Sequence, residues 1–153
     1  MLMNRWIAKT LGLFALLALF GGSTASASET GDETKSAAKD ITPGALVDDK
    51  VSKADDPADW KRFVVEQATS ATLNIYWDNP KVGAKVGIRD MFGASVGEMK
   101  HQSGAEKDTL SGISLNEGTY FIEVAATAGA SVYTLELFLG GSGASPYGIP
   151  RPE

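Results

Sequence analysis

Apolar and polar positions alternate with a period of two through most of the chain after residue 60, in short runs separated by turn-forming residues. In the run 69–77, Leu73, Ile75 and Trp77 share one face, and the Asp-Asn-Pro sequence at 78–80 ends the run. The predicted strands cover residues 60–65, 69–77, 81–90, 95–101, 107–115, 118–126 and 131–139. Seven or eight short strands, with no apolar spacing of 3.6 residues after residue 27, predict an all-β fold, an antiparallel β-sandwich or jelly roll.

The first 27 residues follow a different pattern. Arg5 and Lys9 make the start basic, a mostly apolar run covers 11–20, and Ala-Ser-Ala stands at 25–27. This order is typical of a secretory signal peptide that is cleaved after Ala27. The apolar run is shorter than the ~20 residues that a membrane-spanning helix needs. We therefore expect an exported bacterial protein, secreted or periplasmic, with no membrane span after cleavage.

Composition divides the rest of the chain into three segments. Residues 28–40 are polar and acidic, and we expect them to form a linker or a loosely attached arm. Residues 41–139 contain the predicted strands, and a domain of this size can bury a core without disulfides. Residues 140–153 are rich in Gly, Ser and Pro, and we expect them to form a flexible tail.

Composition and charge exclude several classes of function. The 153 residues include no cysteine and one histidine, which excludes disulfides, cysteine-ligated zinc, a thiol nucleophile and a multi-histidine metal site within one chain. The net charge of −5 becomes −7 once Arg5 and Lys9 leave with the signal peptide, which argues against a nucleic-acid partner. Nine acids and four lysines between residues 28 and 59 give that segment −5 of the charge. The acidity is therefore concentrated at one end.

Three stretches of the predicted sandwich carry ordered motifs in addition to alternation. Residues 55–65 read DDPADWKRFVV, with acids before an aromatic residue and an F-x-V end. Residues 85–93 end in D-x-x-G, and residues 115–124 read L-x-x-G-x-Y-F-I-x-V, followed by Tyr-Thr-Leu at 133–135. In this order and spacing they resemble the bacterial pre-peptidase C-terminal domain family. The resemblance spans about residues 41–139 and implies a small β-sandwich module of a secreted bacterial protein.

The same resemblance implies a calcium site at the entry to the sandwich. Calcium-binding members of the family combine an acidic motif before the domain with the acids of the first motif strand. The corresponding candidate ligands are Glu29, Asp32, Asp56 and Asp59, with Asp55 and Glu33 as substitutes. Calcium takes 6–8 oxygen ligands, and Gly31 stands where the family has an asparagine oxygen. The alternative is that residues 55–57 form an ordinary turn and that residues 29–33 are a solvated tail.

A second candidate site is a surface of outward-facing aromatic side chains. Tyr76, Phe121 and Phe138 stand opposite the apolar positions of their strands, so we expect them to face away from the core. Exposed aromatic side chains suit the binding of a polymer or a partner protein. The alternative is that a loop, the arm or the tail covers them.

One motif resembles a catalytic signature. Residues 93–97 read Gly-Ala-Ser-Val-Gly, which fits the G-x-S-x-G nucleophile pattern. That pattern needs a strand-turn-helix elbow in an α/β fold, whereas these residues lie in a predicted turn between strands and His101 follows after only six residues. Two glycines around a hairpin explain the motif better, and we predict no catalytic residues.

These observations favour a secreted, non-catalytic binding or accessory module. We expect calcium to stabilise it, and its partner to be an extracellular or envelope protein or polysaccharide. The alternative is a structural periplasmic or envelope protein whose sandwich packs into an assembly.

Overall fold

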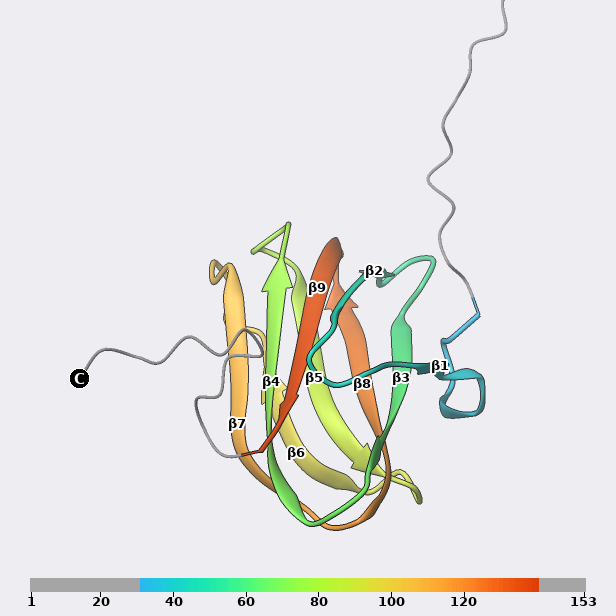
Figure 1. The fold of residues 1–153 in the computed structure, drawn as a ribbon. Helices are drawn as coiled ribbons and strands as arrows, with labels where there is room; N and C mark the ends of the chain where they lie inside the picture. The colour runs from blue at the N-terminus through green and yellow to red at the C-terminus, as the bar shows by residue number, and fades with distance from the viewer. Residues whose placement is uncertain (1–30, 141–153) are drawn as a thin grey trace, which may run out of the picture.

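Extended segments make up most of the described chain. The structure, a computed structural model, describes residues 31–140 (Figure 1). Its elements are the short 3-10 helix η1 (Lys35–Ala37) and the strands β1 (Lys39–Asp40), β2 (Leu46–Ser52), β3 (Ala58–Val65), β4 (Thr69–Trp77), β5 (Gly83–Asp90), β6 (Ser95–Lys100), β7 (Lys107–Leu115), β8 (Gly118–Ala128) and β9 (Ala130–Leu139).

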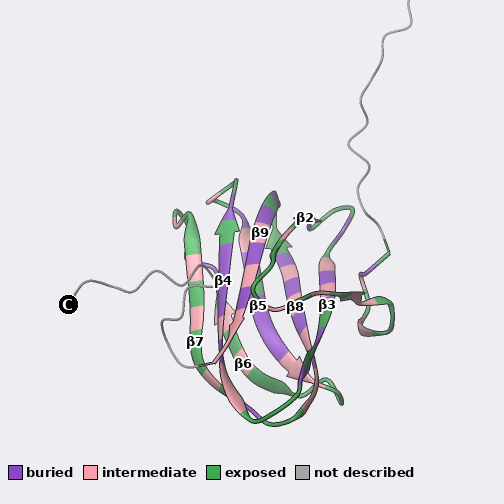
Figure 2. Ribbon diagram, in the orientation of Figure 1, coloured by how far each residue is buried: buried purple, intermediate pink, exposed green. Residues whose placement is uncertain are grey.

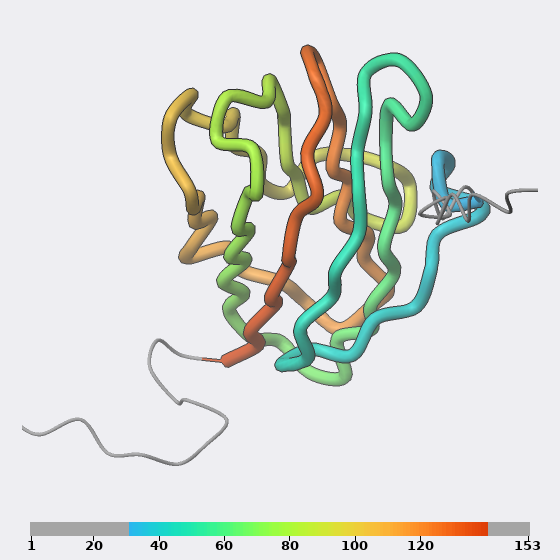
Figure 3. Tube along the Cα trace, turned by 90° about the horizontal axis from the view of Figure 1, so that it is seen from above, coloured from blue at the N-terminus to red at the C-terminus, as the bar shows by residue number. Residues whose placement is uncertain are grey.

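The strands form two sheets that pack face to face (Figure 1, Figure 3). The first sheet has five strands in the order β1-β3-β8-β5-β6, and the second has four in the order β2-β9-β4-β7. Every pair is antiparallel except β1 with β3, which run parallel. The alternation in the sequence therefore predicts the fold class correctly: the chain is an all-β, mainly antiparallel sandwich.

Buried residues alternate with more exposed ones along most of the long strands, as the purple bands in Figure 2 show, and the side chains of these buried residues form the core between the sheets. Leu73 and Ile75 of β4 and Ile122 of β8 are fully buried, on the faces that the sequence pattern predicts. Phe63 of β3 stacks on Tyr120 of β8 with 5.8 Å between ring centroids. Burying side chains of this size contributes about 1.5–3 kcal/mol each. The apolar contacts between the sheets therefore hold the two layers together.

The two long edges of the sandwich are closed differently. At one edge β6 packs against β7, where a Cβ at Gly97 would lie 2.5 Å from Cδ1 of Ile113, so glycine permits this close approach. At the other edge a turn joins β2 to β3, and Ser52 and Asp56 exchange two backbone hydrogen bonds across it. The second edge contains the buried charged residues described below.

The seven predicted strands correspond to β3 through β9, with ends that agree within two residues. The sequence pattern does not predict β1 or β2. Strand β2 alternates as the others do, but Asp48 and Asp49 occupy its centre, so the segment reads as an acidic loop. The short strand β1 gains its order from pairing with β3 and not from its own two residues.

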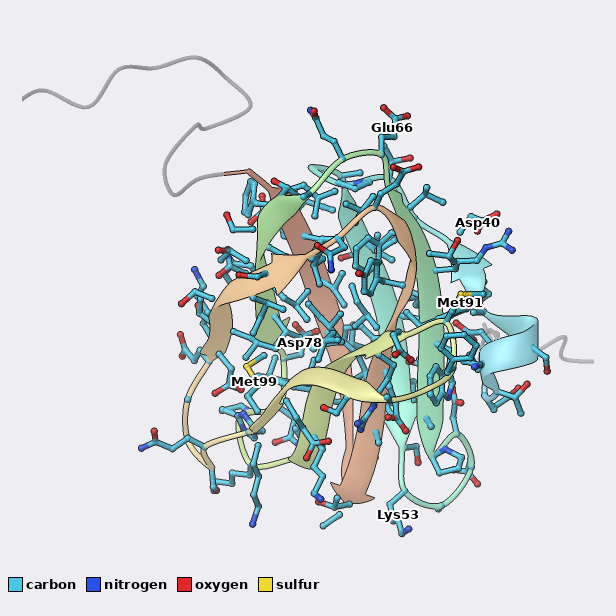
Figure 4. All side chains as sticks on the ribbon, turned by 90° about the horizontal axis from the view of Figure 1, so that it is seen from below. Asp40, Lys53, Glu66, Asp78, Met91 and Met99 are labelled. Atoms are coloured by element: carbon cyan, nitrogen blue, oxygen red, sulfur yellow. The ribbon has the colours of Figure 1, made fainter. Side chains whose placement is uncertain are left out.

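The N-terminal arm is held more firmly than its polar composition predicts. Residues 39–40 form β1, and the backbone N–H of Trp60 donates to the carbonyl oxygen of Asp32 over 2.8 Å. The Lys35 ammonium in η1 donates to the carbonyl oxygen of Met91 over 2.8 Å, and Figure 4 shows Met91 beside this helix. Residues 31–40 are therefore packed against the sandwich.

The predicted signal peptide and all but the first residue of the predicted tail lie outside the described residues. Within residues 31–140, none of the helices has the length and apolar character needed to cross a membrane.

Candidate functional site

Four aspartates and one lysine gather at the edge between β2 and β3. They are Asp32, Asp49, Asp56, Asp59 and Lys61, and this set is referred to below as the acidic cluster. Asp32 precedes η1, Asp49 lies in β2, and Asp56 lies in the turn before β3. Asp59 and Lys61 lie on β3 at positions that alternate with exposed residues, so the strand directs both side chains inward. Except for Asp49, which is half-buried, each member is at most 1% exposed.

The Lys61 ammonium lies between two carboxylates of the cluster. It donates hydrogen bonds to Oδ2 of Asp32 and Oδ2 of Asp49, which tie the arm and β2 to β3. Burial is the largest single effect and disfavours the charged ammonium, but the two hydrogen bonds and the negative charges of Asp32 and Asp49 together outweigh it and raise the pKa of Lys61. Lys39 adds a second cation, with its Nζ 3.6 Å from Oδ1 of Asp32 and 3.9 Å from Oδ2 of Asp49.

The carboxylates of the cluster outnumber its cations. Four carboxylates and the two lysine ammonium groups would leave a net charge of −2 if all were ionised. Burial raises the pKa of Asp59 to about 7, although the Tyr133 hydroxyl donates to its Oδ2 over 2.6 Å. Burial and then the neighbouring acids raise the pKa of Asp56. The cluster therefore favours binding a proton or a further cation.

Several oxygens of the acidic cluster are buried without a hydrogen-bond partner among the described residues. They are Oδ1 of Asp32, both carboxylate oxygens of Asp56 and Oδ1 of Asp59. One oxygen each from Asp32, Asp49 and Asp59 lies within 4.8 Å of the other two. Hard, anionic oxygens gathered in this way, several of them without a hydrogen-bond donor, fit the ligand chemistry of calcium. Lys61 is the one member that donates instead of accepting, and it already neutralises part of the charge.

Sequence reasoning identifies part of this cluster. Three of the four predicted calcium ligands, Asp32, Asp56 and Asp59, come together in it, and Glu29 lies outside the described residues. Of the substitutes, Glu33 accepts from the backbone N–H of Gly31 over 3.1 Å and Asp55 is exposed in the turn.

Asp49 and Lys61 are not among the ligands predicted from the sequence. A signal for each is present, because Asp49 alternates with apolar Val47 and Val51 in β2, and Lys61 alternates with Phe63 and Val65 in β3. In both strands a charged residue therefore stands at a position that alternation directs inward.

The three predicted surface aromatics lie on two opposite faces. Tyr76 of β4 and Phe138 of β9 belong to the four-stranded sheet, and Phe121 of β8 belongs to the five-stranded sheet. The Lys107 ammonium lies 5.0 Å from the ring centroid of Tyr76. On the other sheet, the Lys35 ammonium from the arm lies 5.5 Å from the ring centroid of Phe121. The three side chains therefore do not form one common surface, and the arm partly covers Phe121.

Apolar side chains do gather on the outer face of the five-stranded sheet. The rings of Trp60 and Phe121 meet edge to face, with centroids 6.4 Å apart. Met91 and Phe92, at the β5–β6 turn, are 58% and 83% exposed, and Lys35 bridges the two groups of residues. Trp60, Met91, Phe92 and Phe121 are referred to below as the apolar patch.

The single histidine, His101, is buried and contacts residues from two other segments of the chain. Its Nδ1 lies 2.6 Å from Oδ2 of Asp108, and its Nε2 lies 3.0 Å from the carbonyl oxygen of Pro80. The ring of the buried His101 also packs against Trp77, with centroids 5.1 Å apart. Ser95 of the G-x-S-x-G motif begins strand β6 after a turn, so the motif has no elbow leading into a helix. Both imidazole nitrogens are engaged in contacts that hold loops together.

Comparison with known proteins gives one family match over part of the chain. A model for the secretion system C-terminal sorting domain matches residues 69–135. No curated protein matches the sequence.

Solved structures show what fold the chain shares. The pre-peptidase C-terminal domain of a collagenase from Bacillus anthracis is 14% identical, with 65% of this chain and 93% of that one covered and a TM-score of 0.57. A β-1,3-glucan-binding CBM6 from Bacillus halodurans is 15% identical, with 68% and 99% covered and a TM-score of 0.40. A fucose-binding module from Streptococcus pneumoniae is 13% identical, with 64% and 73% covered and a TM-score of 0.39. Only the first score supports an inference, namely that the chain has a β-sandwich fold like that of a pre-peptidase C-terminal domain.

Proposed function

We propose that the chain is an exported, non-catalytic binding or accessory module, related to the pre-peptidase C-terminal domains, that attaches to an extracellular or envelope polymer through the apolar patch. The observation that carries the proposal is the exposure of Phe92 and Met91 in the β5–β6 turn, which Lys35 connects to the Trp60–Phe121 pair. Large apolar side chains gathered at a surface favour association with a partner. The leader-like first 27 residues, together with the shared fold, support export of the chain.

Retention on insoluble polymers tests the attachment. The purified exported chain would be incubated with peptidoglycan sacculi, chitin and cellulose, and the bound fraction measured. We expect retention on at least one polymer and a several-fold loss in Phe92→Ala. Leu46→Ala is the matched control, because Leu46 is 65% exposed on β2 of the other sheet. Equal retention of Phe92→Ala and wild type would contradict a role for the apolar patch.

The alternative of a structural envelope protein makes a different prediction. Crosslinking in cells would then capture the chain in a complex of fixed stoichiometry, and the purified chain would not be retained on any of the polymers. That combination of results would overturn the binding-module proposal.

We further propose that calcium binds the acidic cluster through Asp32, Asp49, Asp56 and Asp59. The unpaired oxygens of Asp56, Asp59 and Asp32 and the excess negative charge support this assignment. The ion would neutralise the repelling carboxylates that the arm, β2 and β3 contribute. It would thereby stabilise the packing of the arm against the sandwich.

Thermal unfolding with calcium and with a chelator tests this site. At calcium about 100-fold above its Kd, the expected stabilisation is about 2.7 kcal/mol, or a rise in Tm of roughly 10 °C. Magnesium should act more weakly, because it gives up its water ligands reluctantly. Asp56→Asn should raise the Tm without calcium, because it removes an unpaired buried charge, and should abolish the shift with calcium. An unchanged Tm together with no calorimetric binding would refute the site.

A further inference from the structure

The outer face of the five-stranded sheet has a hollow over strands β8, β5 and β6. It is lined by Lys85, Gly87 and Arg89 of β5, Glu98 of β6, and Glu123 and Ala125 of β8, and this set is referred to as the polar hollow. The bottom of the hollow is not filled by side chains, because residue 87 is a glycine and the side chain of residue 125, an alanine, is a single methyl group. A Cβ at residue 87 would lie 3.2 Å from the carbonyl oxygen of Gly97, so a larger residue would both crowd β6 and fill the hollow.

The size of the polar hollow limits what it accepts. Its volume is about 210 Å³. Sites for drug-sized ligands occupy about 300–1,000 Å³, so this one suits a single small ring or one unit of a longer chain. Because the hollow lies on an open sheet face, a polymer can pass over it while one unit enters.

Ion pairs hold the walls of the hollow in place. The Arg89 guanidinium donates from Nε to Oε2 of Glu123 over 2.9 Å and from Nη2 to Oε2 of Glu98 over 2.7 Å. These bonds leave Nη1 of Arg89 and the Oε1 atom of Glu123 to meet a ligand. The Lys85 ammonium lies 4.0 Å from Oε1 of Glu98, beyond hydrogen-bond distance, and can therefore turn toward a ligand. Arg89, Glu98 and Glu123 are thus oriented before any ligand arrives, which lowers the entropic cost of binding.

The charges of the polar hollow balance. Lys85 and Arg89 supply two positive charges, and Glu98 and Glu123 supply two negative ones. An anionic ligand would meet the glutamates, and a cationic ligand would meet Lys85 and Arg89. Interleaved donors and acceptors instead match hydroxyl groups, which donate and accept at once. This chemistry favours a neutral, polyhydroxylated ligand.

An aromatic residue lies on the strand beside one wall of the hollow. Trp60 of β3 pairs directly with Glu123 of β8, one strand away from the bare floor, and its ring packs edge-on against Phe121. A sugar ring has apolar C–H faces as well as hydroxyl groups, so it can pack against an indole while its hydroxyls meet charged side chains.

We propose that the polar hollow binds one residue of a neutral polysaccharide, with Trp60 against an adjoining sugar ring. The inference rests on the proposed function of attachment to an extracellular polymer. It narrows the partner to an uncharged glycan and places the main contacts on β5, β6 and β8. The apolar patch then borders the glycan site at one side.

An amide NMR titration of the exported chain tests the site. The probes are cellohexaose, chitohexaose and mannohexaose, with a hexamer of galacturonic acid as the acidic counterpart. We expect at least one neutral probe at millimolar concentration to shift amides of β5, β6 and β8, and the acidic hexamer to bind more weakly. Ala125→Leu, which fills the hollow, should lower the affinity at least about tenfold. Thr72→Leu, on the outer face of the other sheet, should not change it.

A second variant keeps the test decisive if Ala125→Leu does not fold. Glu98→Gln retains the shape but gives the hollow a net positive charge, and it should weaken neutral binding and strengthen binding of the acidic hexamer. The proposal is overturned if none of the neutral probes shifts these amides, or if the variants bind the responding probe as wild type does. Retention of wild type on an insoluble polymer that survives Ala125→Leu would overturn the glycan site alone and leave the proposed attachment standing.

Discussion

Two groups of charged side chains, one buried where β2 and β3 of different sheets meet and one on the outer face of the five-stranded sheet, differ in burial and in charge balance. The acidic cluster at the β2–β3 edge is nearly inaccessible, and its carboxylates outnumber its cations. The polar hollow on the outer face has two charges of each sign, and the side chains of Arg89 and Glu123 are 20% and 23% exposed. The acidic cluster therefore has an excess of negative charge, whereas the charges of the polar hollow cancel.

The difference follows from the environment of each group of side chains. Water screens the charges of the polar hollow, so its ion pairs contribute little to folding and mainly orient the side chains. Screening is weak inside the acidic cluster, so every uncompensated charge there has a large effect on stability. Burial thus assigns the acidic cluster to stability and the polar hollow to recognition, and the following predictions test this division.

The largest effect is expected from removing the central cation of the acidic cluster. Lys61→Met leaves Asp32 and Asp49 buried without their hydrogen-bond donor. Loss of one partner from a buried ion pair costs about 3–5 kcal/mol. Urea unfolding at pH 7 measures the change, and Lys39→Met, at a lysine 37% exposed, should cost much less. Similar small losses for both variants would mean that Lys61 is not the central counter-ion.

The next effect is a fall in stability between about pH 4 and pH 7 in the absence of calcium. Burial raises the pKa of Asp59 from 3.8 to about 7, so over this range the folded chain keeps a proton that the unfolded chain has lost. Stability from this group is complete below pH 4 and is lost as the pH rises to 7, by at most about 4 kcal/mol. Asp59→Asn should flatten the profile measured by denaturant unfolding. A wild-type profile that rises over the same range would contradict the assignment to Asp59.

Calcium should offset part of that pH dependence. The ion binds ionised carboxylates, so at a fixed calcium concentration its stabilisation should be larger at pH 8, where it is about 2.7 kcal/mol if calcium is about 100-fold above its Kd, than at pH 5. The measurement is the difference in Tm between calcium and chelator at both pH values. Equal shifts at the two pH values would show that the ion acts elsewhere than at Asp59, the carboxyl whose pKa burial raises to about 7.

The smallest effect on folding is expected in the polar hollow. Glu98→Gln removes one acceptor of Arg89, but both side chains reach solvent, and exposed pairs contribute about 0–1 kcal/mol. Chemical unfolding should therefore place this variant within about 1 kcal/mol of wild type. A much larger loss would show that the hollow is part of the structural framework and not a recognition surface.

Alternation in the sequence predicts the core strands because apolar side chains mark their inward faces. Leu73, Ile75, Ile122 and Leu135 are all fully buried at the predicted positions. Alternation does not predict β2, because Asp48 and Asp49 interrupt its series of apolar residues. It does not predict β1 either, because two residues are too few to show a pattern. Both strands form because pairing with β9 or β3 satisfies their backbone groups.

The candidate site divides in the same way. The family-like motif at 55–65 indicates Asp56 and Asp59, and the acidic arm contributes Asp32, which the structure places beside them. Asp49 joins the cluster because β2 lies along the same edge of the sandwich. The pattern of residues within β2 does not predict how close this strand comes to the arm and to β3. Lys61 is a charged residue at a position that alternation directs toward the core. Alternation alone does not show whether such a residue takes part in a buried ion pair or simply interrupts the apolar pattern.

The sequence by itself determined three features: an all-β sandwich, the inward faces of its core strands, and a concentration of acidic residues before residue 60. These features can be read from the sequence because alternation and composition are properties of neighbouring residues. Only the tertiary structure decided that Lys61 stands among four carboxylates, that Tyr76 and Phe121 lie on opposite sheets, and that Lys85, Arg89, Glu98 and Glu123 enclose one hollow. These juxtapositions join residues from different strands. Strand order and register set them, and both result from the pairing of distant segments and not from any single stretch of chain.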